Sequence, residues 1–173
     1  MDPTTIAAQI VAFLAPYLAD AGHAAGQLRV TLPSEAEWEK AARGTAGLRY
    51  PWGDWEAGRA NTEEAGLEET CAGGAFPDGA SPYGVQDCAG NVWEWTRSSW
   101  GRSGPLRPDY GYPYDPADGR EEIGERDWPV LRGGSWIDFR RLARCAYRRR
   151  LIPDVFFDPD IGFRVVVSLV FPS

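Results

Sequence analysis

The sequence has little of the side-chain chemistry that most metal and acid–base sites need. Its 173 residues include one His, one Met and three Cys. Imidazole and thiolate are the ligands that redox metals prefer, so this scarcity argues against most metalloenzymes. The three cysteines are an odd number without CxxC spacing, which indicates a reduced setting and no disulfide framework.

Long hydrophobic runs are absent as well. The apolar stretch from Ile6 to Leu18 is interrupted by Gln9 and Pro16 and is too short to span a bilayer. No basic segment precedes it, unlike the start of a secretory signal peptide. We therefore expect a cytoplasmic protein without a membrane span.

Lysine occurs once, as Lys40, so nearly all basic residues are arginines, a bias that indicates a GC-rich genome and a hot habitat. The net charge of −7 argues against a nucleic-acid partner. Residues 54–127 hold 16 acidic and 6 basic residues, whereas residues 132–164 hold 4 and 8. Either these arginines pair with the acidic segment inside one domain, or they form a basic rim on a binding surface.

What the sequence does contain is rings and turn formers. It has 8 Trp, 7 Tyr, 7 Phe, 20 Gly and 14 Pro among 43% hydrophobic residues. Such a composition favours one globular, loop-rich domain with aromatic anchors over a helical bundle. Residues 101–127 and 44–83 show no regular periodicity and are predicted to be long loops.

Regular elements are predicted at a few places. An apolar stripe at helical spacing predicts an N-terminal helix over residues 4–25, which packs on the core or tethers a partner. A strand is expected over 29–32, followed by a helix from the Ser34–Glu37 capping box through Ala42, with Trp38 and Ala41 inward and Gly44 at its end. Further strands are expected at 92–96, 130–136 and 163–169.

Six short sequence blocks are distinctive enough to indicate a protein family. In chain order they are TLPSEAEWEKAARG (31–44), YPWGD (50–54), AN (60–61), YGVQDCAGNVWEWT (83–96), VLRGGSW (130–136) and IGFRVV (161–166). Together they resemble the formylglycine-generating-enzyme-type (sulfatase-modifying factor) domain, over about residues 27–170. The resemblance implies an α+β, C-type lectin fold with short antiparallel strands, one or two helices and Trp anchors. The domain would occupy 27–173 after a 1–26 helix, so the early part of the family fold is shortened or replaced.

The resemblance does not extend to the family's chemistry. The sulfatase-modifying enzymes bind copper with a cysteine pair just after the GGSW block, but residues 137–143 hold no Cys. Cys145 falls where the family usually has a small residue. The related iron-dependent enzymes need three His, and His23 lies outside the resembling region. We therefore expect no enzyme and no required cofactor; the alternative, an oxidase acting on a peptide or thiol, would need a redox metal site.

The segment 136–164 resembles the variable region of proteins diversified by diversity-generating retroelements, in which template AAY codons become other NNY codons. Against that pattern Arg140, Arg141, Arg144, Cys145, Ala146, Arg148, Pro153, Asp154 and Ile161 sit at fixed positions. The varying positions, none of them a residue that NNY codons exclude, are Ile137, Asp138, Phe139, Leu142, Tyr147, Arg149, Leu151, Ile152, Val155, Phe156, Phe157, Asp158, Pro159 and Asp160. The resemblance implies a non-enzymatic ligand-binding protein with a variable region of about 137–160 and a protein or other macromolecular partner.

The composition of this segment agrees with a binding face. Large apolar residues crowd among turn formers without the alternation of a half-buried strand. A core strand and loop of the same composition is the alternative reading. The run Arg148–Arg150 either attracts a phosphate or carboxylate, or pairs with acidic groups of the domain.

Calcium is the one metal that the resemblance implies. In the resembling enzymes, the loop that matches residues 87–94 holds calcium, which here would use Asp87, Gly90, Val92 and Glu94. Oxygen ligands from a tight turn suit Ca²⁺. A second calcium loop of the family would begin at Asn61, although the acidic residues after it do not align clearly. The alternative for Asp87, Asn91 and Glu94 is hydrogen bonding within turns and loops, without a metal.

Overall fold

The computed structural model describes residues 12–13, 28–104, 106–124, 127–150 and 158–169. The predicted N-terminal helix lies outside this part, apart from Ala12 and Phe13, which are helical. The chain divides into two compact units, one of Met1–Pro33 with Arg164–Ser173 and one of Ser34–Phe163. Among the described residues, no helix has the length and apolarity needed to cross a membrane.

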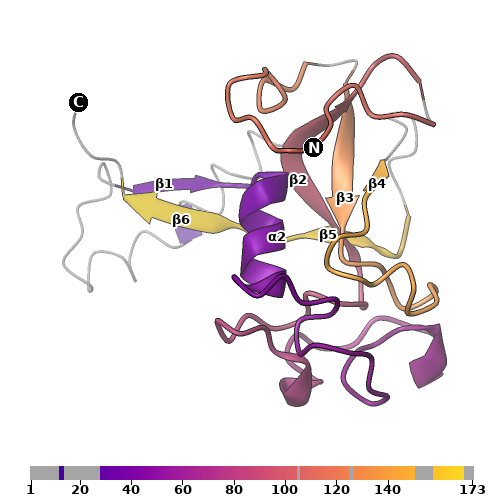
Figure 1. Cartoon of the computed structure of the whole chain (residues 1–173). Coiled ribbons are helices and arrows are strands. Elements are labelled where there is room, and N and C mark those ends of the chain that lie inside the picture. Colours follow the sequence, from indigo (N-terminus) through magenta and orange to yellow (C-terminus); the bar gives the residue numbers. More distant parts are fainter. Residues whose placement is uncertain (1–11, 14–27, 105, 125–126, 151–157, 170–173) are drawn as a thin grey trace. The chain divides into compact units, whose positions relative to one another are not determined.

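The first unit contains a two-stranded sheet. Strand β1 (Leu28–Thr31) pairs antiparallel with β6 (Val166–Leu169), as Figure 1 shows. The strand expected over 29–32 is therefore present, one residue earlier. The strand expected over 163–169 is wrong as a single element, because β5 (Ile161–Phe163) ends before residues 164–165 and joins the sheet of the other unit.

Helix α2 (Glu35–Arg43) begins the second unit, with the predicted caps. The Glu37 amide donates to Ser34 Oγ at 3.1 Å, and the Ser34 amide donates to Glu37 Oε2 at 2.7 Å. Gly44 ends the helix at φ +64°. Trp38 is buried as expected, but the fully buried alanine is Ala42 and not Ala41, because residues four apart share a helix face.

The second unit is built on a mixed sheet in the order β4-β3-β2-β5 (Figure 1). The long β2 (Trp93–Gly101) pairs antiparallel with β3 (Trp128–Arg132) and parallel with β5; β3 also pairs antiparallel with β4 (Arg149–Arg150). β2 thus extends five residues past the predicted strand. β3 ends at Arg132 and not at residue 136, because Gly133 and Gly134 have φ of +101° and +75°.

Side-chain contacts order the long loops, whose described residues include the short 3₁₀ turns Glu63–Ala65 and Pro77–Gly79. Tyr50, Trp52 and Trp55 form an aromatic cluster with ring centroids 5.1–5.9 Å apart. In the loop predicted over residues 101–127, the buried Arg120 guanidinium lies 4.3 Å from the Tyr114 ring and donates to Asp118. Such anchors explain how stretches without periodicity adopt a defined path.

A buried ion network joins the helix to the sheet. The Glu35 side chain is fully buried and accepts from Arg148 Nε at 2.5 Å and Nη2 at 2.7 Å. Arg132, also fully buried, lies 3.5 Å from Glu35 and pairs with Glu39. Because burying a charge without a partner is costly, these groups fix α2 against β3 and the residue before β4.

We expect Glu35→Gln to lower the free energy of unfolding by about 3–5 kcal/mol, because it leaves the buried Arg132 and the mostly buried Arg148 without their shared counter-charge. Urea denaturation at pH 7 measures this. The matched control is Glu56→Gln, which removes an exposed ion pair with Arg59 and should cost less than about 1 kcal/mol. Equal losses in the two variants would contradict the role of the network.

Candidate binding surface

The predicted variable segment begins where β3 ends and folds back on itself. A Cβ atom at Gly134 would lie 2.8 Å from the Ala143 Cα, so only glycine allows this close approach. Consecutive turns follow, in which the amides of Asp138, Leu142 and Ala143 donate to carbonyls three residues earlier. The result is a backbone with many internal hydrogen bonds that presents side chains in fixed directions.

Two of the predicted binding residues face solvent with large apolar side chains. Ile137 is 48% exposed and Phe139 is 51% exposed. Apolar groups this exposed are candidates for contact with a partner, since burying them is favourable. They lie on either side of Asp138, whose side chain has another role.

Asp138 and Asp160 belong to the support of this surface. Asp138 Oδ2 accepts from Trp93 Nε1 at 2.6 Å, and Ser135 Oγ lies 2.7 Å from both Asp138 Oδ2 and Asp160 Oδ2. The Trp93 amide donates to the Asp160 carbonyl at 2.7 Å. Asp160 is fully buried, so its side chain is not available to a ligand, contrary to its place among the predicted binding residues. Sequence reasoning missed Ser135, for which the spacing of three to Asp138 was the available signal.

The remaining predicted binding residues divide between core, surface and the part that the structure leaves out. Leu142 and Tyr147 pack against the buried pair Trp93 and Leu131. Asp158 is half-buried and Pro159 is exposed. Leu151, Ile152, Val155, Phe156 and Phe157 lie outside the described residues.

The run Arg148–Arg150 is largely engaged inside the domain. Arg148 pairs with Glu35, and Arg149 lies 3.8 Å from Asp160 Oδ2 and 5.2 Å from the Trp93 ring. Arg150 lies 4.9 Å from the Trp128 ring. Of the two interpretations of this run, the structure therefore supports pairing within the domain.

The predicted calcium ligands of residues 87–94 have protein partners. Asp87 Oδ2 accepts from the Gly74 amide at 2.7 Å, and Glu94 Oε2 accepts from Trp38 Nε1 at 2.6 Å. The Gly90 carbonyl accepts from the Val92 amide at 3.0 Å. In the described part of the chain, no three His, Cys, Asp or Glu side chains gather as a metal site. Asp87, Gly90 and Glu94 thus make hydrogen bonds within the turn and the core, and calcium binding by this loop stays a prediction.

Asn61 differs from these groups. Its side chain is buried and Nδ2 donates to the Glu69 carbonyl at 2.9 Å, but Oδ1 has no hydrogen-bond partner. Asn91 and Cys71 lie beside it, joined by hydrogen bonds between the Asn91 amide group and the Cys71 backbone. A buried carbonyl oxygen without a donor is a group that a hard cation satisfies.

Cys145 and Cys71 are poorly placed for thiolate chemistry. Cys145 is fully buried beside Trp38, Ala42 and Cys88, and burial raises the pKa of its thiol to about 12. Burial also raises the pKa of the Cys71 thiol. A nucleophilic or metal-binding cysteine needs a lowered pKa.

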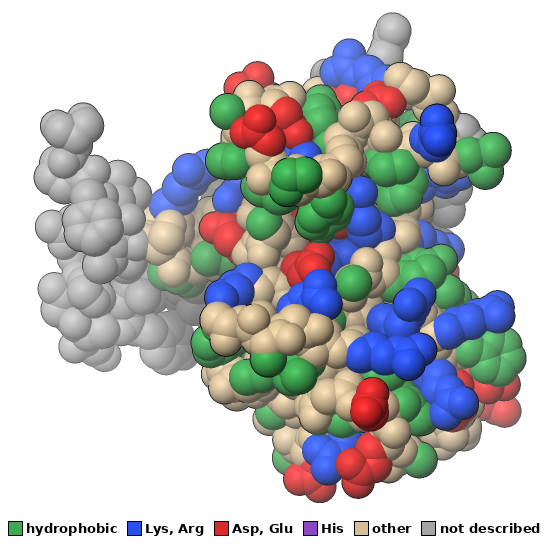
Figure 2. Space-filling model, in the orientation of Figure 1, with side chains coloured by type: hydrophobic (Ala, Val, Ile, Leu, Met, Phe, Trp, Pro, Cys, Tyr) green, Lys and Arg blue, Asp and Glu red, His purple; other side chains and the backbone are tan. Residues whose placement is uncertain are grey.

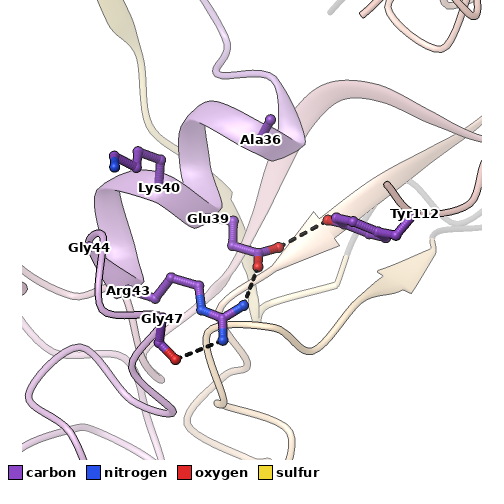
Figure 3. Close-up of a pocket in the computed structure, with 7 residues that line it drawn as sticks. All are labelled: Ala36, Glu39, Lys40, Arg43, Gly44, Gly47 and Tyr112. Atoms are coloured by element: carbon purple, nitrogen blue, oxygen red, sulfur yellow. Dashed lines mark hydrogen bonds and ion pairs between the residues drawn. The ribbon is translucent and has the colours of Figure 1, made fainter. Parts of the chain in front are cut away.

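A pocket of about 330 Å³ opens beside α2 and is lined by Ala36, Glu39, Lys40, Arg43, Gly44, Gly47 and Tyr112. Figure 3 shows the Glu39 carboxylate between Arg43 and the Tyr112 hydroxyl, at 2.6 and 3.0 Å. Arg132 also donates to this carboxylate. Glu39, Arg43 and Tyr112 are thus engaged with one another, and none of the residues that line the pocket belongs to the predicted site.

The capped helix, the mixed sheet of short strands and the long ordered loops define a C-type lectin-like fold of the formylglycine-generating type. The chain belongs to the family described as the Sulfatase-modifying factor enzyme 1-like domain, whose model matches residues 11–169. The fold predicted from the six sequence blocks is therefore confirmed.

Curated relatives include both enzymes and a protein named inactive. The chain is 38% identical over 145 residues to serine/threonine-protein kinase pkn1 of Chlamydia pneumoniae, covering 80% of this chain and 21% of the relative. It is 39% identical over 133 residues to hercynine oxygenase of Mycolicibacterium thermoresistibile (68% and 27%). It is 35% identical over 150 residues to inactive C-alpha-formylglycine-generating enzyme 2 of Bos taurus (77% and 42%). The chain thus spans less than half of each relative.

Two solved structures share the fold. Treponema denticola variable protein 1 superposes with a TM-score of 0.60 at 30% identity, covering 80% of this chain and 47% of that one. PvdO from Pseudomonas aeruginosa superposes with a TM-score of 0.64 at 29% identity, covering 90% and 57%. The chain spans about half of each.

The carboxyl group of Asp160 makes stability depend on pH. Burial, and then the neighbouring Asp158, raise the pKa of Asp160 to about 6; in an unfolded chain it is about 3.9. The folded state thus binds this proton more tightly, so the stability that this group contributes is complete below about pH 4 and lost as pH rises through about 6. We expect the free energy of unfolding of Asp160→Asn, relative to the unsubstituted protein, to rise between pH 4 and pH 7.

Urea denaturation at several pH values measures this difference. Asp118→Asn is the control of opposite sign, because hydrogen bonds from Arg120 lower the pKa of Asp118. Its relative stability should fall over the pH range in which Asp118 ionises. A pH-independent difference for Asp160→Asn would show that its carboxyl group titrates as in the unfolded chain.

Proposed function

We propose that this chain is a non-enzymatic ligand-binding protein that displays a hypervariable surface of the kind that a diversity-generating retroelement produces. The observation that carries the proposal is the contrast within 137–139. Ile137 and Phe139 are about half exposed, while Asp138 between them is bound to Trp93 and Ser135. Exposed side chains on a firmly held backbone can change without a change of fold.

The names of two similar proteins also support a non-enzymatic function. A structural neighbour carries the name variable protein, and one relative carries the name inactive enzyme. The hercynine oxygenase relatives show that other members of the family are enzymes. Against an oxidase here stand the missing cysteine pair after the GGSW block, the single His and the buried Cys145 thiol. Stoichiometric copper or iron in the purified protein, lost in Cys145→Ala, would favour the oxidase instead.

The genomic test concerns the DNA beside the gene. Diversification requires a near-copy of the segment encoding residues 136–164, rich in AAY codons, next to a reverse transcriptase gene. Sequencing of the locus detects both features. A locus without them would refute the diversification part of the proposal and leave the binding part standing.

Binding is tested with Ile137→Ser/Phe139→Ser. We expect the double variant to bind peptides selected from a random 15-residue phage library on the full chain at least tenfold more weakly, because it removes two apolar contacts. Its free energy of unfolding should change by less than about 0.5 kcal/mol, since both side chains are exposed. Leu142→Ser is the matched control, because Leu142 packs on the core and its loss should reduce stability. Unchanged peptide affinity in the double variant would refute this surface as the binding site.

We also propose that a structural calcium ion satisfies Asn61. Its Oδ1 is buried and has no hydrogen-bond donor, and Ca²⁺ prefers oxygen ligands of this kind. We expect the melting temperature of the full chain to be higher in 1 mM CaCl₂ than in EDTA, with the difference lost in Asn61→Ala and kept in the exposed control Glu56→Gln. Identical melting curves in CaCl₂ and EDTA would refute calcium binding.

A further inference from the structure

Three arginines beside the exposed apolar residues lack a counter-charge. Nine arginines of the described residues lie within 4.0 Å of a carboxylate, namely Arg43, Arg59, Arg97, Arg102, Arg120, Arg132, Arg140, Arg148 and Arg149. In the same part of the chain, Arg49, Arg141 and Arg144 have no such ion pair. In a protein of net charge −7, arginines left unpaired at one place are notable.

These arginines gather around one small segment. Arg144 Nε donates to the Arg141 carbonyl at 2.8 Å, and the Cys145 amide donates to the Arg49 carbonyl at 2.9 Å. The Tyr50 hydroxyl donates to the Arg140 carbonyl at 3.1 Å. We call Arg49, Arg140, Arg141 and Arg144 the basic patch. Figure 2 shows Lys and Arg side chains gathered beside hydrophobic ones on the lower right of the face drawn.

The electrostatic surroundings of Tyr50 agree with this arrangement. Burial raises the pKa of Tyr50, and the positive charges of Arg49, Arg140 and Arg144 oppose that rise. The charges of three members of the basic patch therefore act on one hydroxyl group. Arg140 is the partly compensated member, since Glu64 lies 4.0 Å from its side chain.

Aromatic rings hold the guanidinium groups without carboxylates. Arg141 lies 5.8 Å from the centroid of the Phe139 ring and Arg144 lies 5.9 Å from that of Tyr147. Arg49 lies 6.0 Å from Tyr50. Contact with a ring face leaves the N–H donors available for a planar acceptor such as a carboxylate.

The Glu64 carboxylate borders the patch, and further acidic residues are exposed in the same loop. The Glu63 amide donates to the Asp138 carbonyl at 3.0 Å, and the Glu64 carboxylate accepts from the Arg140 amide. Glu68 and Glu69 are exposed in the same loop. These carboxylates would repel the continuous phosphates of a nucleic-acid backbone. A short acidic protein segment, in contrast, can place its few carboxylates on the arginines alone. Arginine beside an exposed aromatic is also typical of protein–protein contacts.

We propose that the binding surface takes an acidic protein segment, with Asp or Glu carboxylates on Arg141 and Arg144 and an apolar side chain on Ile137 and Phe139. The inference rests on the proposed binding function and adds the chemistry of the partner. The arginines of the patch are not among the varying positions. They set a constant preference for acidic partners, within which the varying side chains distinguish one partner from another.

The experiment uses the phage-selected peptides on the full chain. We expect the selected sequences to be enriched in Asp and Glu. Arg141→Gln/Arg144→Gln should weaken their binding at least tenfold in fluorescence anisotropy, with the affinity of the unsubstituted protein falling as NaCl rises from 50 to 300 mM. Arg141→Lys/Arg144→Lys keeps the charge but lacks the planar donors, and should bind more tightly than the Gln variant and more weakly than the unsubstituted protein. Arg107→Gln, an exposed arginine elsewhere, should bind within twofold of the unsubstituted protein.

Each contrary outcome has a distinct meaning. Peptides without acidic enrichment, or unchanged affinity in Arg141→Gln/Arg144→Gln, would overturn the acidic partner, and the proposed function would survive if Ile137→Ser/Phe139→Ser still weakens binding. A 20-base-pair DNA duplex bound as tightly as the peptides, with the same dependence on the arginines, would overturn the choice of a protein partner. Recovery of no peptide by the full chain would overturn both proposals. Circular dichroism melting of each variant separates loss of binding from loss of fold.

Discussion

The ion pairs of the buried Glu35 carboxylate are the interaction on which the packing of the second unit depends. The carboxylate lies fully buried between Arg148 and Arg132, and a charge in that position is tolerated only with close opposite charges. Because Glu35 begins α2, this contact sets the helix against β3 and the entry to β4. Trp38, one turn later, then reaches Glu94 on β2. The helix is thereby linked to neighbouring strands of the sheet, and the candidate binding surface begins at the end of one of them.

In the candidate binding surface, the residues that hold the backbone differ from those that are exposed to solvent. Trp93, Ser135, Asp138 and Asp160 form a connected set of hydrogen bonds beneath the segment, and Gly134 allows the backbone to turn back on itself. Ile137 and Phe139 take no part in this set and point outward. Substitution of the exposed Ile137 and Phe139 should therefore cost little stability, whereas Asp138 and Asp160, although among the positions predicted to vary, are tied into the buried polar contacts.

Local features of the fold were predictable because near neighbours decide them. The capping box of Ser34 and Glu37 depends on residues three apart, and Pro33 follows β1 closely because it offers no amide to a strand. Strand ends were less predictable. β3 stops at two glycines with positive φ, a backbone conformation that tertiary contacts and not the local sequence require. Residues 161–169 form two strands because their two ends pair with different partner strands. Asp160 resembled a surface residue because its partners Ser135 and Trp93 are distant in sequence.

The sequence alone determined the family, the loop-rich architecture and the location of the candidate binding segment, since six blocks in order and the scarcity of His and Cys are properties of the chain itself. Tertiary structure decided which residues of that segment are displayed. It buries Asp160, binds Arg148 and Arg149 to carboxylates, and leaves Arg49, Arg141 and Arg144 without one. The physical reason is that exposure and ion pairing depend on residues brought together across long stretches of chain, such as Arg49 and Cys145, which no local pattern specifies.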